Sequence, residues 1–186
     1  MKTIVISLGG SLIVPDGKTD LNFLHDFKKI IEGSMHNNRF IIVCGGGSIA
    51  RRYIAALKEE GKSELDLAQA GINATRMNAL FMMQLFGKKA NDNLPRSIKE
   101  VKNNLHKNHI VVCGALRFEP KATSDSTAAK IAANLNTIFI NMTNVDGLYD
   151  KDPRKFKEAK LIHKINWSDF EKMALKIPYK PGQHFV

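Results

Sequence analysis

Two short glycine-rich segments each follow an apolar run. Residues 3–13 read TIVISLGGSLI, and residues 44–54 read CGGGSIARRYI. Glycines let backbone N–H groups approach an anion, and a helix beginning after the second segment would add a partial positive charge. A tight turn is the alternative for the first segment. For the second we favour phosphate contact, because three consecutive glycines are entropically costly in a mere linker. The Gly-Lys-Ser/Thr spacing of a P-loop is absent.

A third segment, residues 120–132 (PKATSDSTAAKIA), combines a cation, hydroxyls and a carboxylate at the start of an expected helix. Lys121, Thr123, Ser124 and Asp125 together could bind a phosphate and arrange charge around it. Simple capping of the helix is the alternative interpretation, since hydroxyl and carboxylate side chains are also the preferred N-caps.

A fourth segment, residues 143–156 (TNVDGLYDKDPRKF), follows a strand and places the aromatic Tyr149 among polar neighbours. Such a composition suits a nucleotide base and its ribose. An ordinary surface loop is the alternative.

The elements that must position these segments alternate between strands and helices. Apolar runs predict strands at 3–8, 39–44, 109–115 and 137–143, and helical periodicity predicts helices at 21–31, 48–61, 65–87, 96–105, 124–136 and 167–177. This order predicts an α/β three-layer sandwich, in which a mostly parallel sheet carries helices on both faces. Ligands of such sheets bind beyond the strand carboxyl ends, where all four segments should meet.

Composition narrows the class of protein. The chain has 186 residues, which we interpret as a single domain over 1–186, and its net charge is +10. That charge fits nucleic acid or an anionic small substrate, but the lysines are spread thinly, so nucleic acid is the less favoured partner. No stretch reaches the roughly 18 apolar residues of a membrane span, and a cytoplasmic location is expected. Cys44 and Cys113 end apolar runs and are expected to be reduced and buried.

The four segments together indicate two phosphate-bearing ligands on one sheet edge. Phosphoryl transfer fits this arrangement, because its catalysis consists mainly of positioning and charge neutralisation. The histidines lack metal-ligand spacing, so no metal site made by protein side chains is expected.

In this order the segments resemble the amino-acid kinase family, and within it the archaeal type of uridylate (UMP) kinase. The motifs that carry the resemblance are SLGGSL, CGGGSIARRYI, GINATRMNA, TSDSTAA and TNVDGLYDKDP, between residue 3 and about residue 160. The resemblance implies transfer of the γ-phosphate of ATP to UMP with Mg²⁺. It also implies a homo-oligomer, a hexamer built from dimers.

The resemblance assigns roles to individual residues. Catalysis would involve Asp125, Lys121 and Gly10. ATP would contact Gly9, Gly10, Ser11, Gly47, Arg51, Thr143, Asn144, Tyr149 and Asp152. UMP would contact Gly46, Arg76, Thr123 and Ser124.

Three positions depart from the usual family pattern. Ser7 and Ser48 stand where many members carry lysine, and Ala68 stands where an acidic residue usually contacts the UMP ribose. We expect Lys121 to supply part of the missing charge. The family normally continues past residue 186 with a further helix and strand, which we expect this chain to lack. A nucleotide-binding protein without catalysis and a kinase of another small phosphate or carboxylate acceptor remain alternatives.

Overall fold

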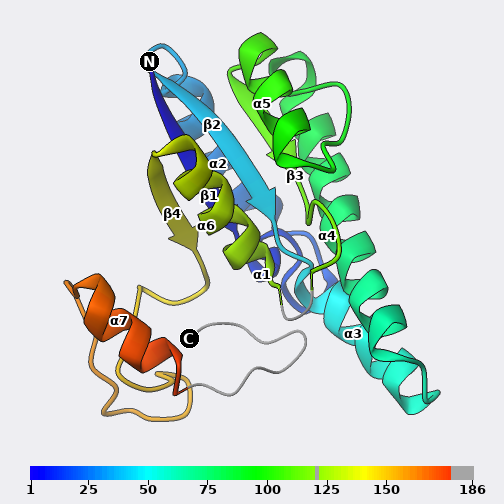
Figure 1. Ribbon diagram of the computed structural model, residues 1–186, viewed down its shortest axis with the longest axis vertical. Helices are drawn as coiled ribbons and strands as arrows, with labels where there is room; N and C mark the ends of the chain where they lie inside the picture. The colour runs from blue at the N-terminus through cyan, green and yellow to red at the C-terminus, as the bar shows by residue number, and fades with distance from the viewer. Residues whose placement is uncertain (120–121, 177–186) are drawn as a thin grey trace.

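The computed structural model describes residues 1–119 and 122–176 (Figure 1). Four parallel strands form one sheet in the order β3-β2-β1-β4. The strands are β1 (Lys2–Leu8), β2 (Asn38–Cys44), β3 (Ile110–Cys113) and β4 (Ile138–Met142). All four predicted strands and their parallel arrangement are therefore confirmed, with ends that differ by one or two residues.

Every predicted helix is also present. The helices are α1 (Gly10–Ile13), α2 (Leu21–Gly33), α3 (Gly47–Glu59), α4 (Glu64–Phe86), α5 (Ile98–Lys107), α6 (Ser124–Leu135) and α7 (Trp167–Ala174), with 3-10 turns η1 (Pro15–Gly17) and η2 (Gly87–Lys89). The sequence did not predict α1, η1 or η2, because three or four residues are too few to show helical periodicity. The long α4 includes Gly71 as one continuous helix.

Side-chain caps fix where α4 and α6 begin. Ser63 forms a capping box with Asp66 at the start of α4, and Thr123 forms one with Ser126 at the start of α6. Each box satisfies backbone N–H groups that the first turn leaves without helical partners. The first turn of α6 is thereby held in place without using Asp125.

The core has two parts, one on each face of the sheet. Alternating residues of β1 divide between them, with Ile6 and Leu8 on the face covered by α2 and α4, and Val5 on the face covered by α5 and α6. Figure 1 shows these helices on either side of the strands. The predicted three-layer architecture is therefore confirmed.

The two cysteines end β2 and β3 and are buried and free, as predicted. Burial raises the pKa of the Cys113 thiol to about 12. Burial, and then the neighbouring Cys113, raise the pKa of Cys44 well above its ordinary value.

The sequence predicted that helices cover both faces of the sheet, but the edge strand β4 is largely exposed. Ile138 is 50% exposed and Ile140 is 42% exposed. Ile138 lies beside Ile4 of β1, and Ile140 lies beside Ile6. On this face of the sheet, α2 and α4 cover the other strands but leave these two residues exposed. In the same part of the chain, α7 contributes no fully buried residue. Within the described ranges, no helix is long and apolar enough to cross a membrane.

Candidate functional site

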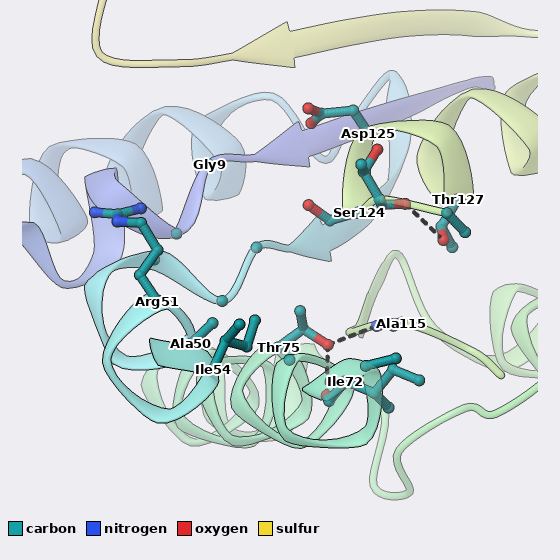
Figure 2. A pocket seen from close by; sticks show the side chains of 18 of the residues that line it. Gly9, Ala50, Arg51, Ile54, Ile72, Thr75, Ala115, Ser124, Asp125 and Thr127 are labelled. Atoms are coloured by element: carbon teal, nitrogen blue, oxygen red, sulfur yellow. Dashed lines mark hydrogen bonds between the residues drawn. The ribbon is translucent and has the colours of Figure 1, made fainter. Parts of the chain in front are cut away.

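A cavity of about 480 Å³ lies at the carboxyl ends of the strands. Its lining combines both glycine segments, the starts of α3 and α6, the first half of α4 and the segment after β3. Figure 2 shows Ser124 and Asp125 of α6 on one side of the cavity and Ile72 and Thr75 of α4 on the other. All four segments were predicted to meet on one edge, and described residues of the first three do so.

The two glycine segments touch each other through their backbones. A Cβ on Gly10 would lie 2.1 Å from the backbone nitrogen of Gly47, and a Cβ on Gly47 would lie 2.4 Å from the carbonyl oxygen of Gly10. Gly47 also has a φ of +63°, a conformation that favours glycine. Gly9 donates its N–H to the carbonyl of Met142 at 2.9 Å. Close backbone packing is therefore one reason for these glycines, and Gly9, Gly10, Gly46 and Gly47 also line the cavity.

The start of α3 is suited to an anion. Its N-cap is Gly46, and among the described residues no side chain caps this helix. Gly46 and Gly47 line the cavity, so the positive end of the helix dipole lies at a wall that Arg51 of the second turn also lines. Ser48 serves the fold instead, because its hydroxyl donates to the carbonyl of Val14 at 2.9 Å and accepts from the N–H of Gly17 at 3.0 Å.

The start of α6 divides its side chains between capping and the cavity. The Thr123 hydroxyl accepts from the N–H of Ser126 at 3.1 Å, so the capping interpretation holds for Thr123. Ser124 and Asp125 have no part in the capping box, and both line the cavity, as does Thr123. The Ser7 hydroxyl donates to Oδ1 of Asp125 at 2.5 Å.

On α4, the residues at helical spacing Glu64, Ala68, Gly71 and Thr75 line the cavity. Ala68 brings no charge to this wall. The nearby Asp66 is turned to its own helix start, where its carboxylate accepts from the hydroxyl of Ser63 at 2.6 Å, a bond that lowers the pKa of Asp66. The sequence did not single out Glu64, although its spacing of four residues from Ala68 could have indicated a shared helix face.

Arg76 lies next to the cavity but is not among the residues that line it. Its guanidinium donates to the carbonyl of Ala115 at 3.1 Å and to that of Leu116 at 2.6 Å, so it supports the segment after β3. Burial, and then the charge of Arg96, lower its pKa. Its contact with UMP stays a prediction.

The segment after β3 contributes Arg117, Phe118 and Glu119 to the cavity wall. No local pattern in the sequence marks them. Glu119 forms an ion pair with Lys130 of α6, which lowers the pKa of the glutamate. Lys121, which we predicted to supply charge, lies outside the described residues.

The fourth segment stands largely apart from the cavity. Thr143 lines it, whereas Asn144, Tyr149 and Asp152 do not. The Tyr149 hydroxyl donates to Asp146 at 3.3 Å, and Asp152 accepts from Nε of Arg154 at 3.1 Å, which lowers the pKa of Asp152. The side chains predicted to hold adenosine are thus bonded to their own loop, and that role stays a prediction.

Ser11 belongs to the four-residue helix α1 and is not among the residues that line the cavity. Within residues 1–119 and 122–176, no group of three or more His, Cys, Asp or Glu side chains is placed to hold a metal ion. Asp125 is the carboxylate beside the hydroxyls at the start of α6 and the end of β1. One carboxylate fits Mg²⁺, which proteins usually hold by one or two carboxylates plus the phosphates of the substrate.

Fold and site together define an α/β protein with a glycine-lined cavity at the carboxyl edge of a parallel sheet. The sequence model that defines the amino acid kinase family matches residues 2–180 of this chain. The chain therefore belongs to the amino acid kinase family.

Similar proteins narrow this comparison. A uridylate kinase of Thermoplasma volcanium is 41% identical over 169 residues, which are 90% of this chain and 72% of the relative. A uridylate kinase of Methanocaldococcus jannaschii is 35% identical over an alignment of 188 positions, which covers 98% of this chain and 81% of the relative. The crystal structure of uridylate kinase from Archaeoglobus fulgidus matches with a TM-score of 0.75 at 35% identity, covering 86% of this chain and 72% of that one.

Proposed function

We propose that this protein is a uridylate kinase, which transfers the γ-phosphate of ATP to UMP and releases ADP and UDP. The observation that carries the proposal is the cavity at the carboxyl ends of the strands, where two glycine segments and the start of α6 meet. The similarity to several uridylate kinases over most of this chain supports the same acceptor.

The chemistry asks little of a general base. An oxygen of the UMP phosphate, largely ionised at neutral pH, attacks the γ-phosphorus. The bond between that phosphorus and the oxygen bridging it to the β-phosphate breaks, and ADP leaves. Catalysis therefore rests on alignment of the two phosphates and on stabilisation of their charge.

We assign the phosphates of ATP to Gly9, Gly10, Gly47 and Arg51, which line one part of the cavity. Ser11 would add its backbone to this group. Asp125 would organise the catalytic charges, together with Lys121. Mg²⁺, bound mainly by the phosphates and reached by Asp125, would neutralise charge on the transferred group.

We place UMP against Gly46, Thr123 and Ser124, with Arg76 supporting that end through the segment after β3. The adenosine of ATP would lie near Thr143, with Asn144, Tyr149 and Asp152 completing its site. These last three would have to exchange some of their present contacts within the loop for contacts with the nucleotide.

The test is a coupled assay of ADP release with UMP, CMP, dTMP, isopentenyl phosphate and acetylglutamate as acceptors. We expect the highest kcat/KM for UMP. A clear preference for an acceptor that is not a nucleotide would contradict the proposal. Ala68 makes this comparison informative, because the α4 wall lacks a carboxylate at that position.

The second candidate is a nucleotide-binding protein without catalysis, and the observation that favours it is the neutral Ser7 at the end of β1. Calorimetry would then show binding of ATP and UMP with no ADP release. Brisk turnover would exclude this candidate.

We further propose a single domain over residues 1–186 that works in the cytoplasm as a homo-oligomer, a dimer or a hexamer. Family resemblance is the support for this part of the proposal. Light scattering of the purified protein would test the oligomeric state, and a monomer at micromolar concentration would contradict it.

A further inference from the structure

Ser7 differs from the other buried polar residues of the described chain in the partner it bonds. Six polar residues are buried in the described parts, namely Ser7, Ser48, Thr75, Asn78, Asn91 and Asn104. The other five donate to backbone carbonyl groups. Ser7 alone donates to a carboxylate, that of Asp125. The hydroxyl of Ser7 therefore bonds a charged group that lines the cavity, whereas the other five side chains satisfy backbone groups.

The fold brings these two side chains together across 118 positions of sequence. Ser7 lies two residues after Val5 on β1, on the face that α6 covers. Asp125 lies in the first turn of α6. Ser7 is 0% exposed, whereas Asp125 is half-buried and lines the cavity. Ser7 is therefore not among the residues that line the cavity, but its hydroxyl bonds a residue that is.

We propose that Ser7 is a positioning residue, whose hydroxyl fixes the orientation of the Asp125 carboxylate for phosphoryl transfer. Ser7 engages Oδ1, and among the described residues no other hydrogen bond to this carboxylate is found, which leaves Oδ2 for a group in the cavity. The inference rests on the proposed phosphotransferase activity. It does not depend on which acceptor takes the phosphate, because the proposed role of Asp125 concerns the transferred group, which is the same for every acceptor.

A neutral hydroxyl predicts a specific kinetic signature. Removing it leaves the charge of the cavity unchanged, so binding of ATP should change little. Losing the fixed orientation of Asp125 should affect the transition state more than the ground state, because small misplacements of a catalytic group are costly. Ser7→Ala should therefore lower kcat by about tenfold or more, with KM values within twofold of wild type.

The experiment compares Ser7→Ala with Ser7→Thr, which restores a hydroxyl, and with Thr137→Val as a control. Thr137 donates to the carbonyl of Thr3 at the opposite edge of the same sheet, so its variant loses a comparable hydroxyl away from the cavity. We expect Ser7→Thr to recover most of kcat and Thr137→Val to leave kcat unchanged. Ser7→Cys, of similar size but a weak donor, replaces Ser7→Ala if the alanine variant unfolds.

A double-mutant cycle with Asp125→Ala separates positioning from a general loss of packing. If Ser7 acts through Asp125, Ser7→Ala should lower kcat by less than twofold in the Asp125→Ala background. Equal reductions in both backgrounds would overturn the proposal, and so would a wild-type kcat in Ser7→Ala.

All rates are measured with the acceptor from the panel above that wild type uses fastest. If an acceptor other than UMP reacts fastest, the assigned substrate is contradicted. The role of Ser7 is then judged from the ratio of wild-type kcat to Ser7→Ala kcat with that acceptor. A protein that phosphorylates no acceptor would overturn both proposals.

Discussion

The two glycine segments and the loop after β4 are built in opposite ways. At Gly10 and Gly47, backbone lies against backbone with no room for a Cβ. In residues 143–156, side chains are exposed or half-buried, and several bond to neighbours in the same loop, as Tyr149 does to Asp146 and Asp152 to Arg154. The shape of the glycine segments depends on the absence of side chains. The loop after β4 is instead held by hydrogen bonds between side chains, which can exchange partners.

This difference teaches where the site tolerates change. A phosphate recognised by backbone N–H groups needs a rigid loop of fixed shape. A nucleoside recognised by side chains can be held by a loop that rearranges when it binds. Substitutions should therefore be most damaging in the glycine segments and mildest in residues 143–156.

The largest effect is expected from Gly10→Ala. The added Cβ would lie 2.1 Å from the backbone nitrogen of Gly47, so the two segments must move apart. We expect kcat/KM to fall at least about 100-fold, because displacements near 1 Å at a catalytic centre cost that much. We also expect a lower Tm in thermal unfolding.

The matched control is Gly33→Ala at the end of α2, where an added Cβ meets nothing within 4 Å. It should keep full activity and an equal or higher Tm, since alanine favours helix over glycine. An active, stable Gly10→Ala protein would break the contrast between the two regions.

Asp125→Asn should have the next largest effect. The amide oxygen can still accept from Ser7, so Tm should stay within a few degrees of wild type. Loss of the negative charge should lower kcat by about 100-fold, the order found when one preorganised electrostatic group is removed. Steady-state kinetics with ATP and UMP measures it.

The control is Asp26→Asn on the exposed side of α2, which removes the same charge away from the cavity. It should leave kcat unchanged. Similar losses in both variants would mean that net charge, rather than the place of Asp125, governs the rate.

These expectations also show what the sequence could and could not predict. The strands and longer helices were predicted to within a few residues, because apolar periodicity and caps are local properties. The glycine segments were placed correctly on one edge, since parallel strands share a carboxyl edge. Exposure of Ile138 could not be predicted, because periodicity does not report how many elements cover a strand.

The contacts that shape the site depend on long-range packing. The bond between Ser7 and Asp125 joins β1 to α6, and no local pattern indicates it. For Thr123 and its neighbours, the sequence left two interpretations open, namely capping of the helix or binding of a phosphate. The structure shows that it caps α6 with Ser126, and Ser124 and Asp125 remain for the cavity.

The buried thiol at the end of β3 gives a third prediction, on stability. The Cys113 thiol has a pKa of about 12 in the fold and 9.0 ordinarily, so the folded chain binds this proton more tightly than the unfolded chain. The stabilisation that the protonated thiol gives to the fold is complete below pH 9 and is lost as the pH rises toward 12. Between pH 8 and 10.5 it should remove about 2 kcal/mol from the free energy of unfolding.

Urea unfolding at both pH values measures this loss. Cys113→Ala, which cannot ionise, should lose about 2 kcal/mol less than wild type over the same range. Equal pH dependence in the two proteins would show that the thiol ionises equally well in the folded and unfolded chains.

The smallest effects are expected in the loop after β4, where they test whether Tyr149 meets the adenine. Tyr149→Phe removes only the hydroxyl bonded to Asp146 and should change the KM for ATP by less than twofold. Tyr149→Ala removes the ring and should raise that KM by about tenfold if the base stacks on it. Phe156→Ala is the matched control, because it deletes a half-exposed ring of the same loop that contacts Lys151. If both alanine variants raise the KM for ATP equally, the loop acts through its shape, and the contrast with the glycine segments disappears.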